Sequence, residues 1–389
     1  MRIKAGKFYD GTLDAPRTNV IVTFDNAKIT SIEPAADGAK ADRETAAITP
    51  GLINAHAHLE MNGEPQTLTV FIVKNEEQRL LSAVASAQKA LRSGVTALRD
   101  LGSSARNNVE VRNAIRGGLI EGPTVVAAGK AICMTGGHGW WFESRQADGP
   151  WDVRKAVREQ LKAGADCIKM IATGGVLTPG AVVGNDQLSE EEMRAGILEA
   201  KTHGMRVAAH AIGANGIKNA IRAGVTSIEH GSYIDEEGIA LMKQHGTTLV
   251  PTLNALMGIL ENAKTFDIPQ YAIDKAKMVG EQLQTNIGRA RKAGVRIAGG
   301  SDAGTPCNKH EDYGREIELM MSMLGMTSRE ALNAATQISG DLLGINEGVL
   351  KPGAPADLLL LDADLELNVL PLKRPLAVIK AGNIVFHRA

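Results

Sequence analysis

Short apolar segments alternate with longer amphipathic segments through the middle of the sequence. The apolar segments predict eight strands, at residues 47–55, 95–101, 124–128, 167–172, 206–211, 226–230, 248–253 and 296–300. Amphipathic helical patterns separate most of these segments, and glycine follows several of the helices, as at Gly204 and Gly224. Eight strand–helix units predict a (β/α)8 TIM barrel of the α/β class, with a doubly wound open sheet as the alternative.

Both ends of the sequence have the pattern of short strands joined by turns. Residues 19–24 and 28–32 have this character near the start, and residues 357–362, 376–380 and 384–386 have it near the end. Neither end is large enough to form a core alone, so we infer that the two ends pair into one small discontinuous β-sandwich domain. The predicted division is 1–48 plus 347–389 for the β-sandwich and 49–346 for the barrel.

Composition excludes several classes of protein. The net charge is −1, from 43 basic and 44 acidic residues, and no basic run occurs, so we expect no nucleic-acid or membrane partner. The three cysteines are widely spaced, which argues against a disulfide framework and fits a reducing compartment. No signal-peptide pattern and no apolar stretch of about 18 residues occurs, so we expect a soluble, cytoplasmic protein.

Two histidines, His56 and His58, lie at the end of the first predicted strand. Alternate side chains of a strand point to the same side, so the two imidazoles can face one point. Imidazole is a common neutral ligand for divalent transition metals. The pair therefore predicts part of a metal site.

Other polar residues with suitable chemistry occupy the later strands. Lys169 lies within the fourth strand, His210 and His230 end the fifth and sixth, and Asp302 follows the eighth. In a barrel of parallel strands, active-site residues gather at the carboxyl ends of the strands. Imidazoles and a carboxylate suit Zn²⁺, with Mn²⁺, Fe²⁺ and Co²⁺ as alternatives.

Lys169 is the unusual member of this group. An ammonium group does not bind a metal, and its burial among Ile168, Met170 and Ile171 is costly unless it loses its charge. A neutral amine can add carbon dioxide and form a carbamate, whose two oxygens can bridge two metals. The alternative is an ion pair of Lys169 with Asp302 or Glu229.

These motifs resemble the amidohydrolase superfamily, and within it the imidazolonepropionase-like branch that contains Xaa-Pro dipeptidases and Xaa-Arg/Lys carboxypeptidases. The resemblance covers nearly the whole chain and rests on residues 50–58, 99–102, 136–139, 168–170, 209–211, 228–232 and 300–306. It implies two divalent metals, with Zn²⁺ expected. The implied ligands are His56, His58 and Asp302 for the first metal, His210 and His230 for the second, and Lys169, as its carbamate, bridging both.

The resemblance also implies substrate contacts in three loops. His138, in Gly-Gly-His-Gly after the third strand, would polarise the scissile carbonyl, and Tyr233 would contact the substrate carbonyl or carboxylate. Trp140 and Trp141 either wall a substrate pocket or pack over the barrel rim. The glycine-rich loop at 173–180 is similar to a lid, or is an ordered rim loop.

The expected activity is binuclear metal-dependent hydrolysis of an amide in a dipeptide or N-acyl amino acid with a free carboxylate. Metal-bound hydroxide would attack the carbonyl, and Asp302 would pass the proton to the leaving nitrogen. Superfamily deaminases typically lack the lysine, so Lys169 favours amide hydrolysis. A mononuclear deaminase or cyclic-amide hydrolase acting on a heterocycle and a non-catalytic scaffold are the alternatives. We expect the small-molecule enzyme to be a homo-oligomer.

Overall fold

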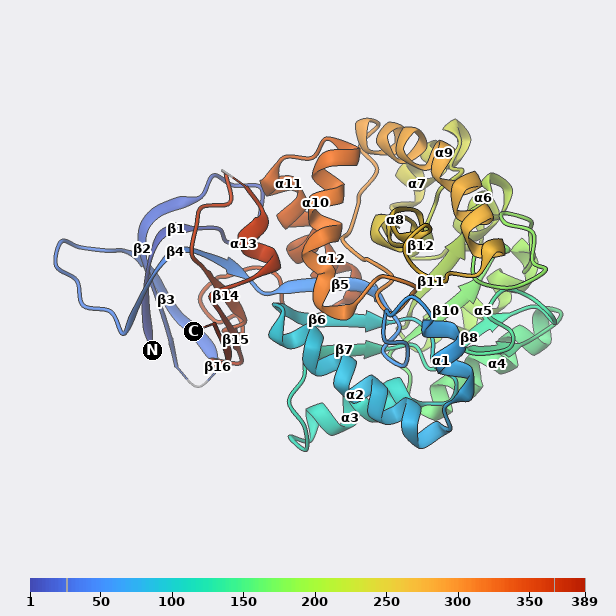
Figure 1. Cartoon of the computed structure of the whole chain (residues 1–389), viewed down its shortest axis with the longest axis horizontal. Helices are drawn as coiled ribbons and strands as arrows, with labels where there is room; N and C mark the ends of the chain where they lie inside the picture. Colours follow the sequence, from blue (N-terminus) through green and yellow to red (C-terminus); the bar gives the residue numbers. More distant parts are fainter. Residues whose placement is uncertain (26, 367, 389) are drawn as a thin grey trace.

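The computed structural model describes residues 1–25, 27–366 and 368–388. Figure 1 shows strands from both ends of the chain gathered on one side, with a larger assembly of strands and helices on the other. Most strands of this larger part follow the predicted ranges, and their neighbours run parallel, which confirms the predicted TIM barrel with a terminal β domain. The division at residues 48/49 and 346/347 stays a prediction.

The terminal strands form one seven-stranded sheet in the order β16-β15-β14-β4-β1-β2-β3. Its strands are β1 (Arg2–Phe8), β2 (Arg17–Asp25), β3 (Lys28–Pro34), β4 (Arg43–Pro50), β14 (Leu358–Leu361), β15 (Ala377–Lys380) and β16 (Asn383–His387). Pairing of β14 with β4, from Leu358 opposite Pro50 to Leu361 opposite Ala47, joins the two ends of the chain. A separate apolar core that includes Ile48 lies against this sheet.

Parallel strands form the barrel, in agreement with the alternating sequence pattern. They are β5 (Leu52–Ala57), β6 (Val95–Asp100), β7 (Thr124–Ala127), β10 (Cys167–Ile171), β11 (Arg206–Ala211), β12 (Ser227–His230) and β13 (Thr248–Val250). Residues 296–300 close the ring, because Ala298 N donates to Leu249 O and Ala55 N donates to Gly299 O, both at 2.9 Å. Two short strands, β8 (Ala131–Cys133) and β9 (Ser144–Gln146), extend beside β10.

One predicted strand, at 47–55, is two strands in the structure. The segment up to Pro50 belongs to the terminal sheet as β4, and the barrel strand β5 begins at Leu52. Gly51 lies between them against the side chain of Thr96, where a Cβ atom would come within 2.0 Å of Thr96 Oγ1. Only glycine fits this passage from one sheet to the other.

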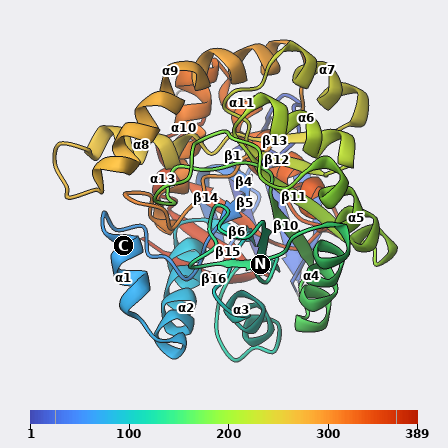
Figure 2. The same cartoon turned by 90° about the vertical axis from the view of Figure 1, so that its right-hand side faces the viewer.

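Helices surround the barrel strands, and Figure 2 shows them as a ring. They are α1 (Thr67–Val73), α2 (Glu76–Arg92), α3 (Asn107–Arg116), α4 (Pro150–Ala163), α5 (Glu190–Thr202), α6 (Ala214–Ala223), α7 (Glu236–His245), α8 (Leu253–Asn262), α9 (Gln270–Lys292), α10 (Tyr313–Leu324), α11 (Ser328–Asn333) and α12 (Ser339–Leu343). The short helix α13 (Leu370–Lys373) lies between the terminal sheet and α10 (Figure 1). A 3₁₀ turn (His310–Asp312) precedes α10, and a π-turn (Ala334–Ile338) joins α11 to α12. Within the described residues, no helix is long and apolar enough to cross a bilayer.

Glycines end several helices as the sequence pattern predicts. Gly94, Gly204, Gly224 and Gly294 each have a positive φ, at +106°, +67°, +101° and +84°. This left-handed conformation lets the chain leave the helix and turn into the next strand. These turns lie at the amino ends of the strands, so the carboxyl ends gather at the opposite end of the barrel.

Candidate active site

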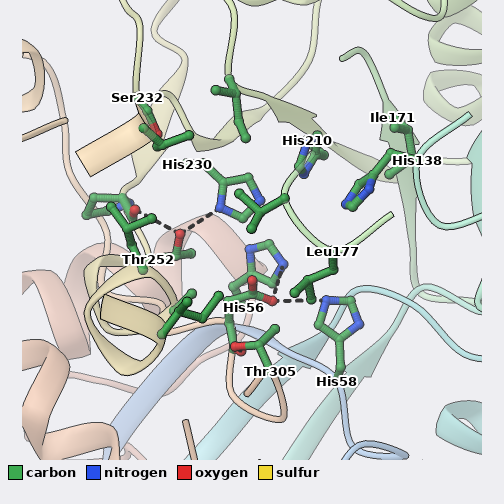
Figure 3. A pocket seen from close by; sticks show the side chains of 18 of the residues that line it. His56, His58, His138, Ile171, Leu177, His210, His230, Ser232, Thr252 and Thr305 are labelled. Carbon is green, nitrogen blue, oxygen red and sulfur yellow. Dashed lines mark hydrogen bonds and ion pairs between the residues drawn. The ribbon is translucent and has the colours of Figure 1, made fainter. Parts of the chain in front are cut away.

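Five histidines line one cavity at the carboxyl ends of the barrel strands. His56 and His58 extend from β5, His210 lies on β11, His230 ends β12, and His138 lies between β8 and β9. Figure 3 shows their imidazoles turned toward a shared space. Their ring centroids form a chain from His58 through His56, His230 and His210 to His138, with successive separations of 5.4, 5.3, 4.6 and 4.6 Å.

Asp302 joins the first two histidines. Its Oδ1 atom lies 3.3 Å from His56 Nε2 and 3.1 Å from His58 Nε2. The backbone of Asp302 donates to His56 O at 2.8 Å, which fastens the end of the last barrel strand to the first. Asp302 and His230 both have a positive φ, +59° and +70°, a conformation that non-glycine residues adopt rarely and often at functional sites.

Burial and neighbouring charges set the protonation of these groups. Burial lowers the pKa of His56, of His210 and of His230, the last to about 4, so these imidazoles are neutral. Burial also lowers the pKa of His58, but the Glu143 and Asp302 carboxylates outweigh it and leave the pKa raised. Burial raises the pKa of Asp302, yet the adjacent imidazoles hold it well below its usual range.

Lys169 lies on β10 and lines the same cavity. Its side chain is buried, and burial lowers the pKa of its amine. Over residues 1–25, 27–366 and 368–388 Lys169 forms no ion pair, so the alternative of an ion pair with Asp302 or Glu229 is not seen. Burial outweighs the charges of Glu229, Asp302 and Glu143, which act to raise the pKa of Lys169, so the neutral amine is favoured.

The donor set fits a divalent metal. One nitrogen of His56, one of His230 and one oxygen of Asp302 lie within 4.8 Å of one another. His210 Nε2 is buried and accepts or donates no hydrogen bond within the described chain. A buried polar atom without a partner is costly, and a metal ligand position would satisfy it. Neutral imidazoles with a carboxylate are ligands that suit Zn²⁺.

Two buried glutamates stand behind the first histidine pair. Glu229 Oε2 lies 2.9 Å from His56 Nδ1, and Glu143 Oε2 lies 2.8 Å from His58 Nδ1. Arg99 donates to Glu229 Oε1 at 2.9 Å and to the backbone oxygen of Ala55 at 2.8 Å. Each imidazole is therefore held from behind by a carboxylate while its Nε2 faces Asp302, an arrangement that orients metal-binding histidines.

His138 is positioned by a different group. Its Nδ1 lies 2.8 Å from Thr178 Oγ1, which also accepts from Gly139 N at 3.0 Å. The Thr178 hydroxyl proton is thus free to go to Nδ1, which leaves the His138 proton on Nε2. Burial lowers the pKa of His138 to about 3, so its ring is neutral. Gly175 lies against this ring, where a Cβ would come within 2.5 Å of Nε2.

Of the two placements considered for Trp140 and Trp141, the structure favours packing outside the cavity over forming its wall. Trp140 is 46% exposed, and neither Trp140 nor Trp141 lines the cavity; Phe142 does. The turn after Gly139 directs only Phe142 toward the cavity. The ring of Trp141 packs on that of Phe142, with centroids 4.6 Å apart. Tyr233 also lies outside the lining, although its neighbour Ser232 belongs to it. Substrate contact by Tyr233 therefore stays a prediction.

The rest of the cavity wall is largely apolar. Residues of α8, α9 and the loop after β10 form it together with Phe142. They are Val176, Leu177, Ala255, Leu256, Ile259, Val279 and Leu283. A wall of this kind suits an apolar group of a ligand beside the polar cluster of histidines.

Sequence reasoning missed Glu143, Thr178 and Thr252. Thr252 Oγ1 lies 2.7 Å from His230 Nδ1 and has a φ of +50°. From the sequence, Glu229 was considered only as an ion-pair partner of Lys169. In the structure its carboxylate contacts His56 instead. A signal for Glu229 exists, because it directly precedes His230 at the carboxyl end of β12, where the candidate ligands gather.

Comparison with known proteins identifies the family. A model of the amidohydrolase family matches residues 47–385. Ochratoxinase of Aspergillus niger is 33% identical over 319 residues, which cover 75% of this chain and 64% of that protein. The chain thus spans somewhat less than two thirds of the length of this curated relative.

Solved structures of similar proteins cover the chain almost completely. A Xaa-Pro dipeptidase with methionine bound in its active site has 33% identity and a TM-score of 0.90, over 98% of both chains. A prolidase in complex with N-methylphosphonate-L-proline has 28% identity and a TM-score of 0.90, over all of both chains.

This chain belongs to the amidohydrolase family. The predicted enzyme class, a hydrolase of amide carbon–nitrogen bonds, agrees with membership of that family.

Proposed function

We propose that the chain hydrolyses the amide bond of a dipeptide or N-acyl amino acid with a free carboxylate, in a metal-dependent reaction. One observation carries this proposal: five histidines and Asp302, with the buried Lys169, converge in a single cavity whose remaining wall is largely apolar. Similarity to a Xaa-Pro dipeptidase, a prolidase and ochratoxinase supports it.

Two divalent ions, expected to be Zn²⁺, would be held by these side chains. We propose His56, His58 and Asp302 for one ion and His210 and His230 for the other, with Lys169 as a carbamate between them. When bound, such ions polarise a carbonyl and lower the pKa of water. The amine of Lys169 has the property that carbamate formation needs, because burial lowers its pKa and favours the neutral form.

Asp302 and His138 would act directly on the reacting groups. The carboxylate of Asp302 stays ionised because its pKa is held low, so it can accept a proton from the attacking water. The same carboxyl group then donates this proton to the leaving nitrogen. His138 presents Nε2–H while Thr178 holds its Nδ1, so it can donate a hydrogen bond to the carbonyl oxygen of the amide.

A mass-spectrometric screen tests the proposal. Metal-loaded protein is incubated with a library of dipeptides and N-acyl amino acids, beside the variants Asp302→Asn and Asp341→Asn. Asp341 is an exposed aspartate paired with Arg296 and is the matched control. We expect cleavage by the wild type and the control, and a loss of about 10²–10⁴-fold in Asp302→Asn.

Other outcomes would favour other functions. Absence of cleavage by metal-loaded protein would contradict the proposal. Release of ammonia from a heterocycle would favour the deaminase alternative, and failure to bind metal would favour a scaffold. The expected homo-oligomer also stays a proposal, which light scattering during size-exclusion chromatography tests.

A further inference from the structure

The cavity lacks an obvious partner for a substrate carboxylate. Of the described residues that line it, Lys169 is the sole lysine and arginine is absent. Lys169 lies within the buried strand β10 beside the histidines. A carboxylate that enters the cavity therefore needs a cation from just outside the lining.

Lys275 on α9 is placed to supply that cation. It precedes Val279 by four residues and Leu283 by eight, and both of these apolar residues line the cavity. Residues at this spacing lie on one face of a helix. Lys275 is only partly buried, so it lies nearer the solvent than Val279 and Leu283 on this face of α9.

The ammonium of Lys275 has unused hydrogen-bonding capacity. Its Nζ donates one hydrogen bond, to Thr178 O at 2.7 Å, and lies 5.5 Å from the ring centroid of Tyr271. Two of its three hydrogens have no partner across the described parts of the chain, and no carboxylate forms an ion pair with it there. Burial without such a partner lowers the pKa of Lys275.

Lys275 also lies near His138. Both contact Thr178, Lys275 through the backbone oxygen and His138 through the hydroxyl, and the positive charge of Lys275 contributes to the low pKa of His138. In an N-acyl amino acid, only the nitrogen and Cα separate the scissile carbonyl from the carboxylate. Groups that recognise these two parts of the substrate must therefore be close neighbours, as His138 and Lys275 are.

We propose that Lys275 binds the free carboxylate of the substrate and so restricts the enzyme to amides that carry one. This inference rests on the proposed function, since it names a recognition residue for the same cavity. It assigns Lys275 a role in specificity, while the proton transfer remains with Asp302.

A pair of substrates that differ only in the carboxylate tests the proposal. N-acetyl-L-phenylalanine carries it, N-acetylphenethylamine lacks it, and both present a phenyl ring that suits the apolar wall. Lys275→Met keeps the length of the side chain and removes its charge. We expect kcat/KM for N-acetyl-L-phenylalanine to fall about 10–100-fold, mainly through KM, while the value for N-acetylphenethylamine changes less than about threefold. Lys275→Arg should restore part of the preference.

Tyr271→Phe is the matched control, because the Tyr271 hydroxyl donates to Leu177 O at 3.1 Å and holds the same loop without a charge. We expect this variant to keep the preference for the carboxylate substrate. Equal losses for both substrates in Lys275→Met, or the same effect in Tyr271→Phe, would show that Lys275 only fastens the loop.

Binding measurements separate this inference from the proposed function. If the wild type cleaves neither compound, calorimetry with the metal-loaded protein still measures the binding of both. Tight binding of N-acetyl-L-phenylalanine that weakens at least tenfold in Lys275→Met would support the role of Lys275 even then. Absence of binding, or equal binding of the two compounds by the wild type, would overturn it.

Discussion

The geometry behind His56 makes a sharp prediction for Glu229→Gln. Both carboxylate oxygens of Glu229 face a donor, Oε1 the guanidinium of Arg99 and Oε2 the Nδ1 of His56, each at 2.9 Å. Glutamine offers one oxygen and one NH₂ group, so one of these two donors must face another donor. The side chain is fully buried, so water does not relieve the conflict.

Loss of such a group behind a metal-binding histidine lowers metal affinity about 10–100-fold, or roughly 1.4–2.7 kcal/mol. Glu143→Gln is the matched comparison. Within the described chain Glu143 forms an ion pair with His58 alone, so a glutamine can turn its oxygen toward that ring. We expect its metal affinity to fall by only about threefold, since the contact with His58 Nδ1 survives and only charge is lost.

Competition with a chelator of known zinc affinity, followed by mass spectrometry of the bound metal, measures both variants against the wild type. Circular dichroism establishes that both variants fold. Wild-type affinity in Glu229→Gln, or equal losses in the two variants, would refute the reasoning, because the contrast depends on the second donor that only Glu229 serves.

Two further predictions concern a loop glycine and a buried histidine. Gly175→Ala places a Cβ against His138 Nε2, so we expect kcat to fall about tenfold or more in a variant that circular dichroism shows to be folded; wild-type activity would contradict this geometry. Burial lowers the pKa of His310 to about 4, below its ordinary value of 6.5, so its contribution to stability is present above pH 6.5 and is lost as the pH falls toward 4. In urea unfolding, the free energy of unfolding of His310→Gln relative to that of the wild type should rise by about 2 kcal/mol when the pH is lowered from 7 to 5. A difference between the two proteins that does not change with pH would contradict the assignment.

The barrel and the metal-binding candidates follow from the sequence because both depend on regular structure. Alternation of strand and helix patterns sets the order of the parallel strands, and parallel strands bring their carboxyl ends together. His56, His210, His230 and Asp302 could therefore be grouped without knowledge of any loop. The division of the first predicted strand at Gly51 was missed. The chain passes from one sheet to another within a continuous apolar segment, so the sequence pattern does not change there.

Loops and helix faces account for what the sequence did not reveal. Trp140, Trp141 and Phe142 are consecutive, and only the conformation of their turn decides that Phe142 enters the cavity. Glu143 follows in the same irregular segment. Without a helix or strand repeat there, the sequence does not indicate where its side chain points. Lys275 lies on an amphipathic helix, whose pattern predicts a polar residue but not that it meets the loop at Thr178.

The central claim is that this cavity hydrolyses an amide with water and releases an amino acid. The most direct test is a reaction of metal-loaded protein with N-acetyl-L-phenylalanine in H₂¹⁸O, analysed by mass spectrometry. We expect acetate with one ¹⁸O atom and unlabelled phenylalanine, formed by the wild type and not by Asp302→Asn. Recovery of intact substrate from fully metal-loaded wild type, across this compound and the dipeptide library, would contradict it.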